Sequence, residues 1–142
     1  MGAQITTRSF RISDYEAAVE LWTRVPGVEI SEGDAREDIS LYLKRNPDLS
    51  RVAEDRGRLI GAALCGEDGR RGYIYHLAID PDYQQQGLAR RLVSECLERL
   101  AAKGLQRALI IVADDNPRGR AFWERCGWEE VSGTKLMGID LR

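Results

Sequence analysis

The stretch DPDYQQQGLARR, residues 80–91, joins the two most regular patterns of the chain. Before it, residues 73–80 (YIYHLAID) are rich in aromatic and β-branched side chains, which predicts a strand. After it, residues 87–103 repeat apolar side chains every three to four positions, which predicts a long amphipathic helix that ends at Gly104. A strand that passes through a glycine-containing turn into a long helix favours an α/β fold.

The start of this helix has two unusual features. Gln86 and Gly87 stand where a helix usually has a residue that accepts hydrogen bonds from its first N–H groups. Arg90 and Arg91 lie in or near the first turn, where the helix dipole disfavours cations. Both features are explained if an anion, most simply a phosphate or pyrophosphate, binds to the first turn. A turn capped by water is the alternative that these residues leave open. The other predicted helices begin with capping residues: Ser13, Asp34 and Asn116.

The rest of the chain has no linker, repeat or low-complexity segment, which predicts one domain over residues 1–142. Alternation and turn residues predict the order β-α-α-β-β-β-α-β-α-β-β, an α/β protein with a mixed sheet. The remaining predicted strands are 4–12, 50–54, 58–65, 108–112, 128–131 and 135–141, and the remaining predicted helices are 13–24, 34–46 and 116–126.

Composition excludes several classes of protein. The formal net charge of −2 argues against nucleic acid as the main ligand. No apolar run is long enough to span a membrane, and residues 1–4 carry no sign of a secretory leader. The cysteines, Cys65, Cys96 and Cys126, are odd in number and widely spaced, which predicts reduced, buried thiols in a cytoplasmic protein. The single histidine leaves no set of metal ligands, so no metal site is expected.

Residues 84–89 match a known signature. Gln84-x-x-Gly87-x-Ala89 resembles the Q/R-x-x-G-x-G/A signature of the GNAT superfamily of N-acetyltransferases. Asn116 followed by residues 121–128 (AFWERCGW) is similar to a second segment of that family, at the right distance along the chain. The nucleotide-binding patterns G-x-G-x-x-G and G-x-x-x-x-G-K-[ST] are both absent. The chain therefore resembles the small single-domain bacterial members of the YpeA type.

The resemblance implies a GNAT fold, with a central mixed, largely antiparallel sheet of six to seven strands and about four helices. It also implies acetyl-CoA as cosubstrate. The backbone of residues 77–79 would pair with the pantetheine arm, and the amides of residues 84–90 would hold the pyrophosphate. The cofactor would enter where two central strands splay apart. The residues assigned to it are Leu77, Ala78, Ile79, Gln84, Gln85, Gln86, Gly87, Leu88, Ala89, Arg90, Asn116 and Trp123.

The usual acid and base of the family are missing here. Trp123 stands where many relatives have a tyrosine that protonates coenzyme A. Tyr73 and Tyr75 are the substitutes that the sequence offers, and strand alternation predicts them on the same face as Leu77, with His76 on the opposite face. The two tyrosines can equally be core or pocket-lining aromatics. If no enzymic acid acts, catalysis depends on positioning and on an oxyanion amide near Leu77.

The acceptor is expected to be a primary amine, of a small molecule or of a protein. The first two predicted helices, their connecting loop (residues 25–34) and the final hairpin would build the acceptor pocket. The loop is acidic, which would suit a cationic amine, and a solvated acidic loop without this role is the alternative. The alternative function is a module of the same fold that binds acyl-CoA with little or no turnover. Either protein would be a monomer or a homodimer.

Overall fold

The computed structural model describes residues 4–141 and divides the chain into two compact units, Met1–Ile111 and Val112–Arg142. The expectation that one domain covers the whole chain stays a prediction. Residues 1–3, on which the expectation about a secretory leader partly rests, lie outside the described residues.

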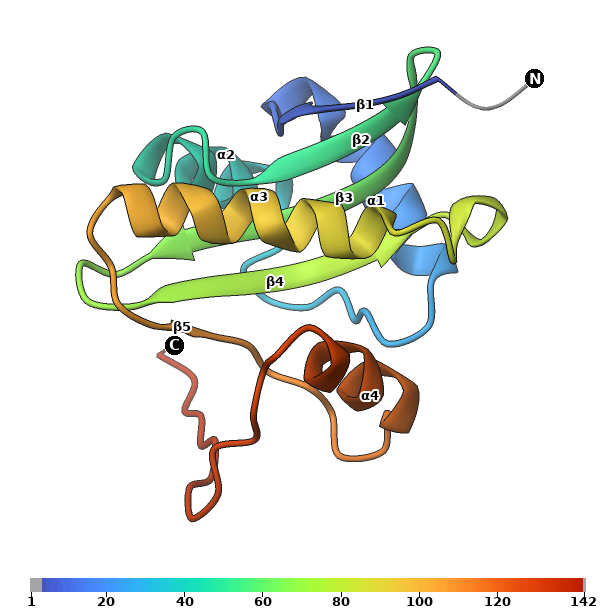
Figure 1. Cartoon of the computed structure of the whole chain (residues 1–142). Helices are drawn as coiled ribbons and strands as arrows, with labels where there is room; N and C mark the ends of the chain where they lie inside the picture. The colour runs from blue at the N-terminus through green and yellow to red at the C-terminus, as the bar shows by residue number, and fades with distance from the viewer. Residues whose placement is uncertain (1–3, 142) are drawn as a thin grey trace. The chain divides into compact units, whose positions relative to one another are not determined.

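The first unit is built on a five-stranded sheet whose strands lie in chain order (Figure 1). β1 to β4 pair antiparallel, and β5 runs parallel to β4. The prediction of a mixed, largely antiparallel sheet is therefore confirmed, whereas the predicted count of six to seven strands is too high for the described residues. The strands are β1 (Ile5–Ser9), β2 (Arg51–Asp55), β3 (Arg58–Glu67), β4 (Gly72–Ile79) and β5 (Ala108–Leu109).

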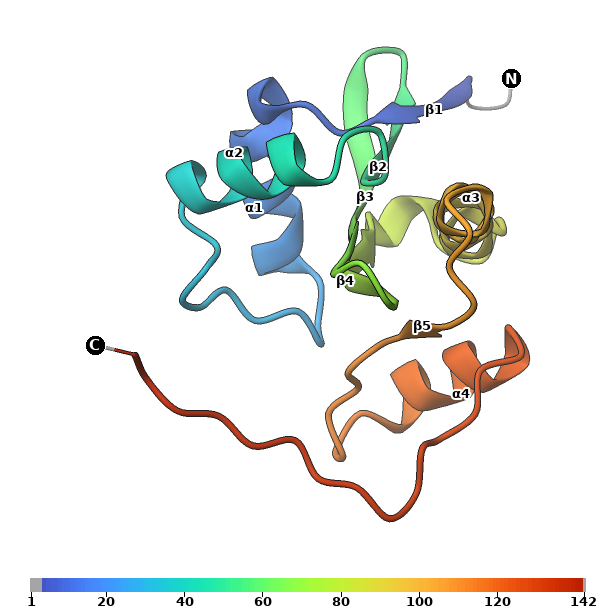
Figure 2. The same ribbon diagram turned by 90° about the vertical axis from the view of Figure 1, so that its left-hand side faces the viewer.

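The described residues form four α-helices, as the family resemblance implied, three in the first unit and one in the second. Figure 2 shows α1 and α2 on one face of the sheet and α3 on the other. Two short 3₁₀ turns, Ile12–Asp14 and Pro81–Tyr83, precede α1 and α3. The helices are α1 (Tyr15–Arg24), α2 (Arg36–Arg45), α3 (Leu88–Ala102) and, in the second unit, α4 (Pro117–Arg125).

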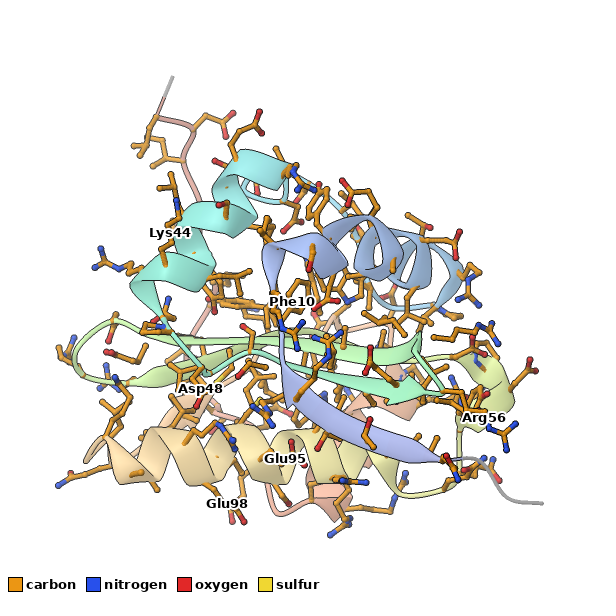
Figure 3. The ribbon with its side chains drawn as sticks, turned by 90° about the horizontal axis from the view of Figure 1, so that it is seen from above. Phe10, Lys44, Asp48, Arg56, Glu95 and Glu98 are labelled. Carbon is orange, nitrogen blue, oxygen red and sulfur yellow. The ribbon has the colours of Figure 1, made fainter. Side chains whose placement is uncertain are left out.

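A polar network ties α3 to the strands across from it. Arg51, only 6% exposed, donates from Nε to Oε1 of Glu95 at 3.0 Å, and the Thr7 hydroxyl donates to Oε2 of Glu95 at 2.8 Å. Figure 3 shows Glu95 on α3, on the opposite side of the sheet from Phe10. Because the buried cation is hydrogen-bonded and paired, it fixes the helix on the sheet without an unsatisfied charge.

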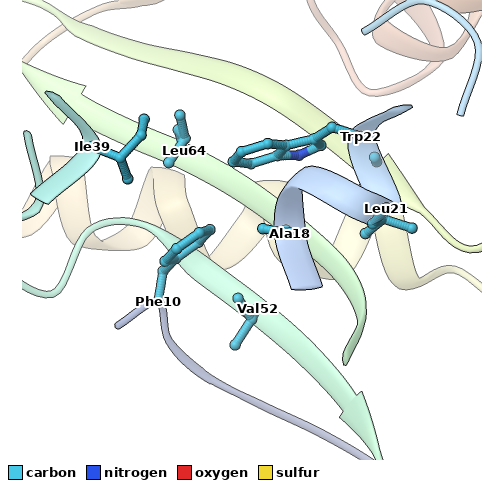
Figure 4. Packing of buried hydrophobic residues seen from close by; sticks show 9 residues of the cluster. Phe10, Ala18, Leu21, Trp22, Ile39, Val52 and Leu64 are labelled. Carbon is cyan, nitrogen blue, oxygen red and sulfur yellow. The ribbon is translucent and has the colours of Figure 1, made fainter. Parts of the chain in front are cut away.

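Each face of the sheet has its own hydrophobic cluster. α3 covers one face, where Leu88 and Leu92 pack with Ile60 and Ile79. α1 and α2 cover the other face around Trp22, which is fully buried (Figure 4). This second cluster consists of Phe10, Ala18, Leu21, Trp22, Ile39, Val52, Ala62, Leu64 and Ala78.

Two predicted helix caps are wrong. Asp14, not Ser13, organises the start of α1: its Oδ2 accepts from the Arg11 N–H at 2.8 Å and pairs with Arg8 at 2.8 Å. Asp34 does not cap α2, which begins after Ala35 without a side-chain cap. The Asp34 carboxylate is engaged elsewhere, because its Oδ2 accepts from the Ser31 N–H at 3.0 Å. At Asp34 a backbone N–H of the preceding loop takes the oxygen that would otherwise cap the helix.

The second unit confirms one predicted cap and corrects the end of the chain. The Asn116 side chain accepts from the Gly119 N–H at 3.0 Å and caps α4, whose end is marked by Gly127 at φ +95°. The predicted hairpin of residues 128–131 and 135–141 is absent, although a turn lies at 132–133. Alternation alone does not make a strand, since its backbone also needs a hydrogen-bonded neighbour.

β5 is also shorter than predicted. The apolar run 108–112 predicts a strand buried on both faces, but β5 spans only Ala108–Leu109, which is half-buried, and Ile111 is 59% exposed. The parallel ladder with β4 consists of two pairs, Gly72↔Ala108 and Tyr73↔Leu109. Only the first two residues of the apolar run therefore form a strand, and the run is not a full central strand.

The packing of α3 predicts the result of a matched pair of substitutions. Leu92 is 0% exposed, so Leu92→Ala should lower the free energy of unfolding by about 2 to 5 kcal/mol through lost burial and a residual cavity. Leu41→Ala, at a side chain 65% exposed, should change it by about 0.5 kcal/mol or less. Urea unfolding of the two variants measures both values, and equal effects would contradict this packing.

Candidate functional site

The turn between β4 and α3 is anchored by a buried carboxylate. Asp80 is 1% exposed, and its Oδ1 accepts from the Asp82 N–H at 2.9 Å. Its Oδ2 lies 3.3 Å from Arg24 Nη1 and 3.1 Å from Arg58 Nη2. One side chain thus joins the end of α1, the start of β3 and the turn. Sequence reasoning missed this role, although an Asp-Pro pair directly after a strand is a turn signal.

The residues that follow open α3 without a side-chain cap. The Gln84 side chain donates from Nε2 to the Ile79 carbonyl at 3.0 Å and holds the turn against the strand end. Gln85 and Gly87 adopt left-handed backbone conformations, with φ +64° and +78°. No side chain caps α3 at Gly87, and the first N–H groups of an α-helix have no acceptor within the helix itself.

The space above Gly87 is open. A Cβ built on this residue would meet no heavy atom within 4 Å. A ligand can therefore approach the backbone closely, and the positive φ favours glycine at the same position. The two features noted in the sequence are both present, because α3 begins at Leu88 without a side-chain cap and Arg90 and Arg91 lie in its first turn.

β4 offers a free edge beside this turn. The ladder with β5 ends at Tyr73, and among residues 4–141 no strand pairs with Ile74–Ile79 on that side. The Asp80 N–H bonds to the Ile60 carbonyl of β3. Since backbone groups alternate along a strand, those of Ala78 face β3, whereas those of Leu77 and Ile79 face the free edge. On this edge the Ile79 carbonyl accepts the hydrogen bond from the Gln84 side chain.

A bulge interrupts β4 next to Leu77. β3 and β4 pair through Ala62↔Ala78 and then through Leu64↔Tyr75, so two β4 residues, His76 and Leu77, lie opposite one β3 residue. His76 has φ +55°, a left-handed conformation that costs a non-glycine residue about 1 to 2 kcal/mol. The Trp22 indole donates to the His76 carbonyl at 2.7 Å and holds this conformation.

The bulge overturns the prediction that Tyr75 and Leu77 share a face. Tyr75 pairs with Leu64, which belongs to the cluster under α1 and α2, whereas Leu77 packs against the cluster under α3. His76 was expected to point away from Tyr75, but its ring lies 5.0 Å from that of Trp22, on the α1 side. An inserted residue reverses the alternation of every residue beyond it.

Tyr73 and Tyr75 form a stacked pair at the beginning of β4. Their ring centroids are 6.1 Å apart, with planes inclined by 10°. Together with Tyr42 of α2 they line a groove of about 250 Å³ beside the β3–β4 turn. Burial raises the pKa of Tyr75 above its usual value, with a smaller contribution from Tyr73. The structure therefore brings the two tyrosines together, but on the opposite face of the sheet from Leu77.

The acidic loop meets the bulge through one contact that the sequence did not predict. Asp34 Oδ2 lies 3.0 Å from His76 Nε2. The same oxygen accepts from the Ser31 N–H, and the Tyr15 hydroxyl donates to the Asp34 carbonyl at 2.6 Å. No sequence signal pairs residues 34 and 76, because the contact depends on the bulge.

The second unit holds the other residues assigned by the resemblance. Asn116 caps α4, and the Trp123 ring lies 5.2 Å from Phe122 and 5.1 Å from Trp128 in edge-to-face contacts. Cys126 is half-buried at the end of α4, so only Cys65 and Cys96 match the expectation of buried thiols. All three thiols are free.

Within residues 4–141, no helix is long and apolar enough to cross a membrane. In the same residues, no group of three or more histidine, cysteine or acidic side chains is arranged to hold a metal ion.

Comparisons with known proteins show which family and fold the chain resembles. A family model described as "Acetyltransferase (GNAT) family" matches residues 15–128. An acetyltransferase of Pectobacterium atrosepticum is 35% identical over 124 residues, which are 87% of each chain. The ribosomal-protein-S18-alanine N-acetyltransferase of Escherichia coli shares the fold with a TM-score of 0.76 and 23% identity, over 91% of this chain and 80% of that one. The PaiA N-acetyltransferase of Thermoplasma acidophilum, solved with coenzyme A, has a TM-score of 0.78 and 19% identity over 93% of each chain.

Asp80 provides the test of how the turn is held. Asp80→Ala should lower the free energy of unfolding by about 2 to 3 kcal/mol, less than for a fully enclosed ion pair because Arg24 and Arg58 reach solvent. Amide exchange of residues 81–90 should become faster. Asp82→Ala, at an exposed side chain in the same turn, is the control and should change stability by about 0.5 kcal/mol or less. A turn that exchanges as slowly in Asp80→Ala as in the wild type would contradict the anchoring role.

Proposed function

The chain belongs to the GNAT family of acetyltransferases, and we propose that it transfers the acetyl group of acetyl-CoA to a primary amine. The observation that carries the proposal is the uncapped start of α3 at left-handed Gly87, next to the free edge of β4. A helix start of this kind binds anions through its N–H groups and its dipole. Two phosphates joined to a flexible, amide-containing arm fit a turn and a strand edge that lie side by side.

In this proposal the pyrophosphate binds at the turn and the pantetheine arm pairs with β4. The amides of residues 84–90 hold the phosphates, and Arg90 adds a positive charge near them. Of the three β4 residues assigned to the arm, the alternation of the strand favours Leu77 and Ile79 over Ala78. The relative from Thermoplasma acidophilum, whose structure contains coenzyme A, supports the same donor. Asn116 and Trp123 stay predictions of the family resemblance.

The chemistry we propose is direct transfer. The amine nitrogen attacks the thioester carbonyl carbon, the C–S bond breaks, and the nitrogen loses a proton to solvent. The Leu77 N–H, directed at the free edge, is the candidate donor to the oxyanion that forms on the carbonyl oxygen. Such a donor is most effective when it is fixed in advance, and the bulge at His76 fixes it.

Neither tyrosine is needed for this reaction as a strong acid. The thiol of coenzyme A resembles a free cysteine, with a pKa of about 8.5, so it can leave as a thiolate and take a proton from water. The pKa of Tyr75 is raised by burial, which makes its hydroxyl a weaker acid than usual. Tyr73 and Tyr75 therefore stay candidates for a minor role, such as lining the path of the acceptor.

The acceptor itself is a primary amine whose identity the family does not fix. Residues 25–34 carry the exposed carboxylates of Glu29 and Glu32, which would suit a cationic amine, whereas the Asp34 carboxylate is engaged with His76 and Ser31. An assay that follows thiol release from acetyl-CoA across a panel of amines, set beside coenzyme A binding, tests the proposal. Binding without release for any amine would contradict acetyl transfer.

Gly87→Val is expected to weaken coenzyme A binding at least about tenfold, which corresponds to about 1.4 kcal/mol. The branched side chain would occupy the open space through which the phosphates reach the backbone. Isothermal titration calorimetry with coenzyme A measures the affinity.

Gly104→Val is the matched control for backbone strain. Gly104 also has a positive φ, +88°, with no heavy atom within 4 Å of its Cβ position, but it lies at the other end of α3. Its substitution should lower stability as much as Gly87→Val and leave coenzyme A affinity within about twofold. Equal losses of affinity in both variants would contradict the assignment of the pyrophosphate to this turn.

The tyrosines provide a separate test of the chemistry. Tyr73→Phe and Tyr75→Phe should each lower kcat by less than about 100-fold. A residue that acts as general acid typically contributes about 10² to 10⁴-fold, and the proposed reaction does not need either tyrosine in that role. The rate should rise with pH until the acceptor amine is deprotonated, since only the neutral amine attacks. A larger loss with intact coenzyme A binding would identify a dedicated proton donor.

A further inference from the structure

The Asp34–His76 pair joins two segments whose roles the proposed function keeps apart. Asp34 ends the acidic loop before α2, and His76 is the left-handed residue of the β4 bulge. Their side chains meet at 3.0 Å and are largely enclosed, with 11% and 18% of their surfaces exposed. A hydrogen bond between enclosed groups cannot readily be replaced by a hydrogen bond to water. It therefore restrains both segments.

Asp34 is itself held in place on its own side. Its Oδ2 accepts from the Ser31 N–H at 3.0 Å, and its own N–H bonds to the Ser31 carbonyl at 3.2 Å. The Tyr15 hydroxyl of α1 donates to its carbonyl at 2.6 Å. The hydrogen bonds between Ser31 and Asp34 therefore fix the last turn of the loop. The same Asp34 carboxylate contacts His76 in the bulge.

His76 is held equally firmly on the strand side. Its carbonyl accepts from the Trp22 indole at 2.7 Å, and its ring packs edge-on against the Trp22 ring at 5.0 Å. The direction of the next amide, Leu77 N–H, follows from the left-handed conformation of His76. A contact that fixes the His76 side chain consequently also restrains the Leu77 N–H.

We propose that Asp34 and His76 are positioning residues for acyl transfer. Their hydrogen bond holds the end of the acidic loop against the β4 bulge, so that the acceptor loop and the oxyanion amide of Leu77 keep a fixed relation. This inference rests on the proposed function, which supplies the roles of the loop and of the amide. In this role, neither side chain accepts a proton from the substrates or donates one to them.

Two substitutions break the contact while preserving each backbone. His76→Gly removes the ring and tolerates the left-handed conformation, so the bulge itself remains accessible. Asp34→Ala removes the carboxylate from the other partner. Each variant should lower kcat at least about tenfold and leave coenzyme A affinity within about threefold. The double variant should lose no more than the worse single variant, because both remove one interaction.

Hydrogen exchange reports the coupling without turnover. His76→Gly should accelerate exchange in residues 28–35, and Asp34→Ala should accelerate exchange in residues 75–78, each in the segment that was not altered. Asp34→Asn keeps an oxygen in place for the His76 ring and should stay within about threefold of wild-type kcat. Glu95→Gln, an equally conservative change of an enclosed carboxylate on α3, is the control and should change neither segment.

The results separate this inference from the proposed function. Unchanged exchange in the unaltered segment, additive losses in the double variant, or an Asp34→Asn loss as large as that of Asp34→Ala would each overturn it. If the wild-type chain binds coenzyme A and acetylates no amine, the proposed function fails, and the exchange results alone decide whether the pair couples loop and bulge.

Discussion

The bulge in β4 is the constraint on which the site depends. It places one residue, His76, in a conformation that a non-glycine side chain adopts only at a cost, and it reverses the alternation of the strand from that point on. The side chain of Ala78 then packs under α1, and that of Leu77 packs under α3. The backbone groups of Leu77 and Ile79 face the free edge of the strand. Trp22, buried in the core, is the residue that compensates for the strain, because its indole N–H satisfies the His76 carbonyl.

The side chains that pack the core therefore also determine the geometry of the site. Trp22 is fully buried and belongs to the cluster that holds α1 and α2 on the sheet. Asp80 plays the corresponding part at the strand end, where it links α1, β3 and the turn that opens α3. Each of these side chains lies in the interior, yet each holds a backbone segment next to which the proposed ligands would bind. Positioning of this kind needs a rigid support behind the reacting groups.

The sequence predicted the features that are local. The strand–turn–helix around Gly87 and the cap at Asn116 depend on short-range patterns, and both are present. The largely antiparallel sheet was implied by the family resemblance and not by a local pattern. The faces of Tyr75, His76 and Leu77 could not be predicted, because the inserted residue is visible only in the register against β3. The role of Asp34 was misjudged for a related reason, since its partner lies 42 positions further along the chain.

The turn before α3 is held by hydrogen bonds within the chain. Gln84 is bonded to the strand, Asp80 closes the 3₁₀ turn, and Tyr83 donates from its hydroxyl to Asp55. The conformational entropy of this segment is thus lost during folding and not upon association, which is what preorganisation means for affinity. Acyl donors that share the same phosphates should then associate in one step at similar rates, and differences in their affinity should lie in how fast they dissociate.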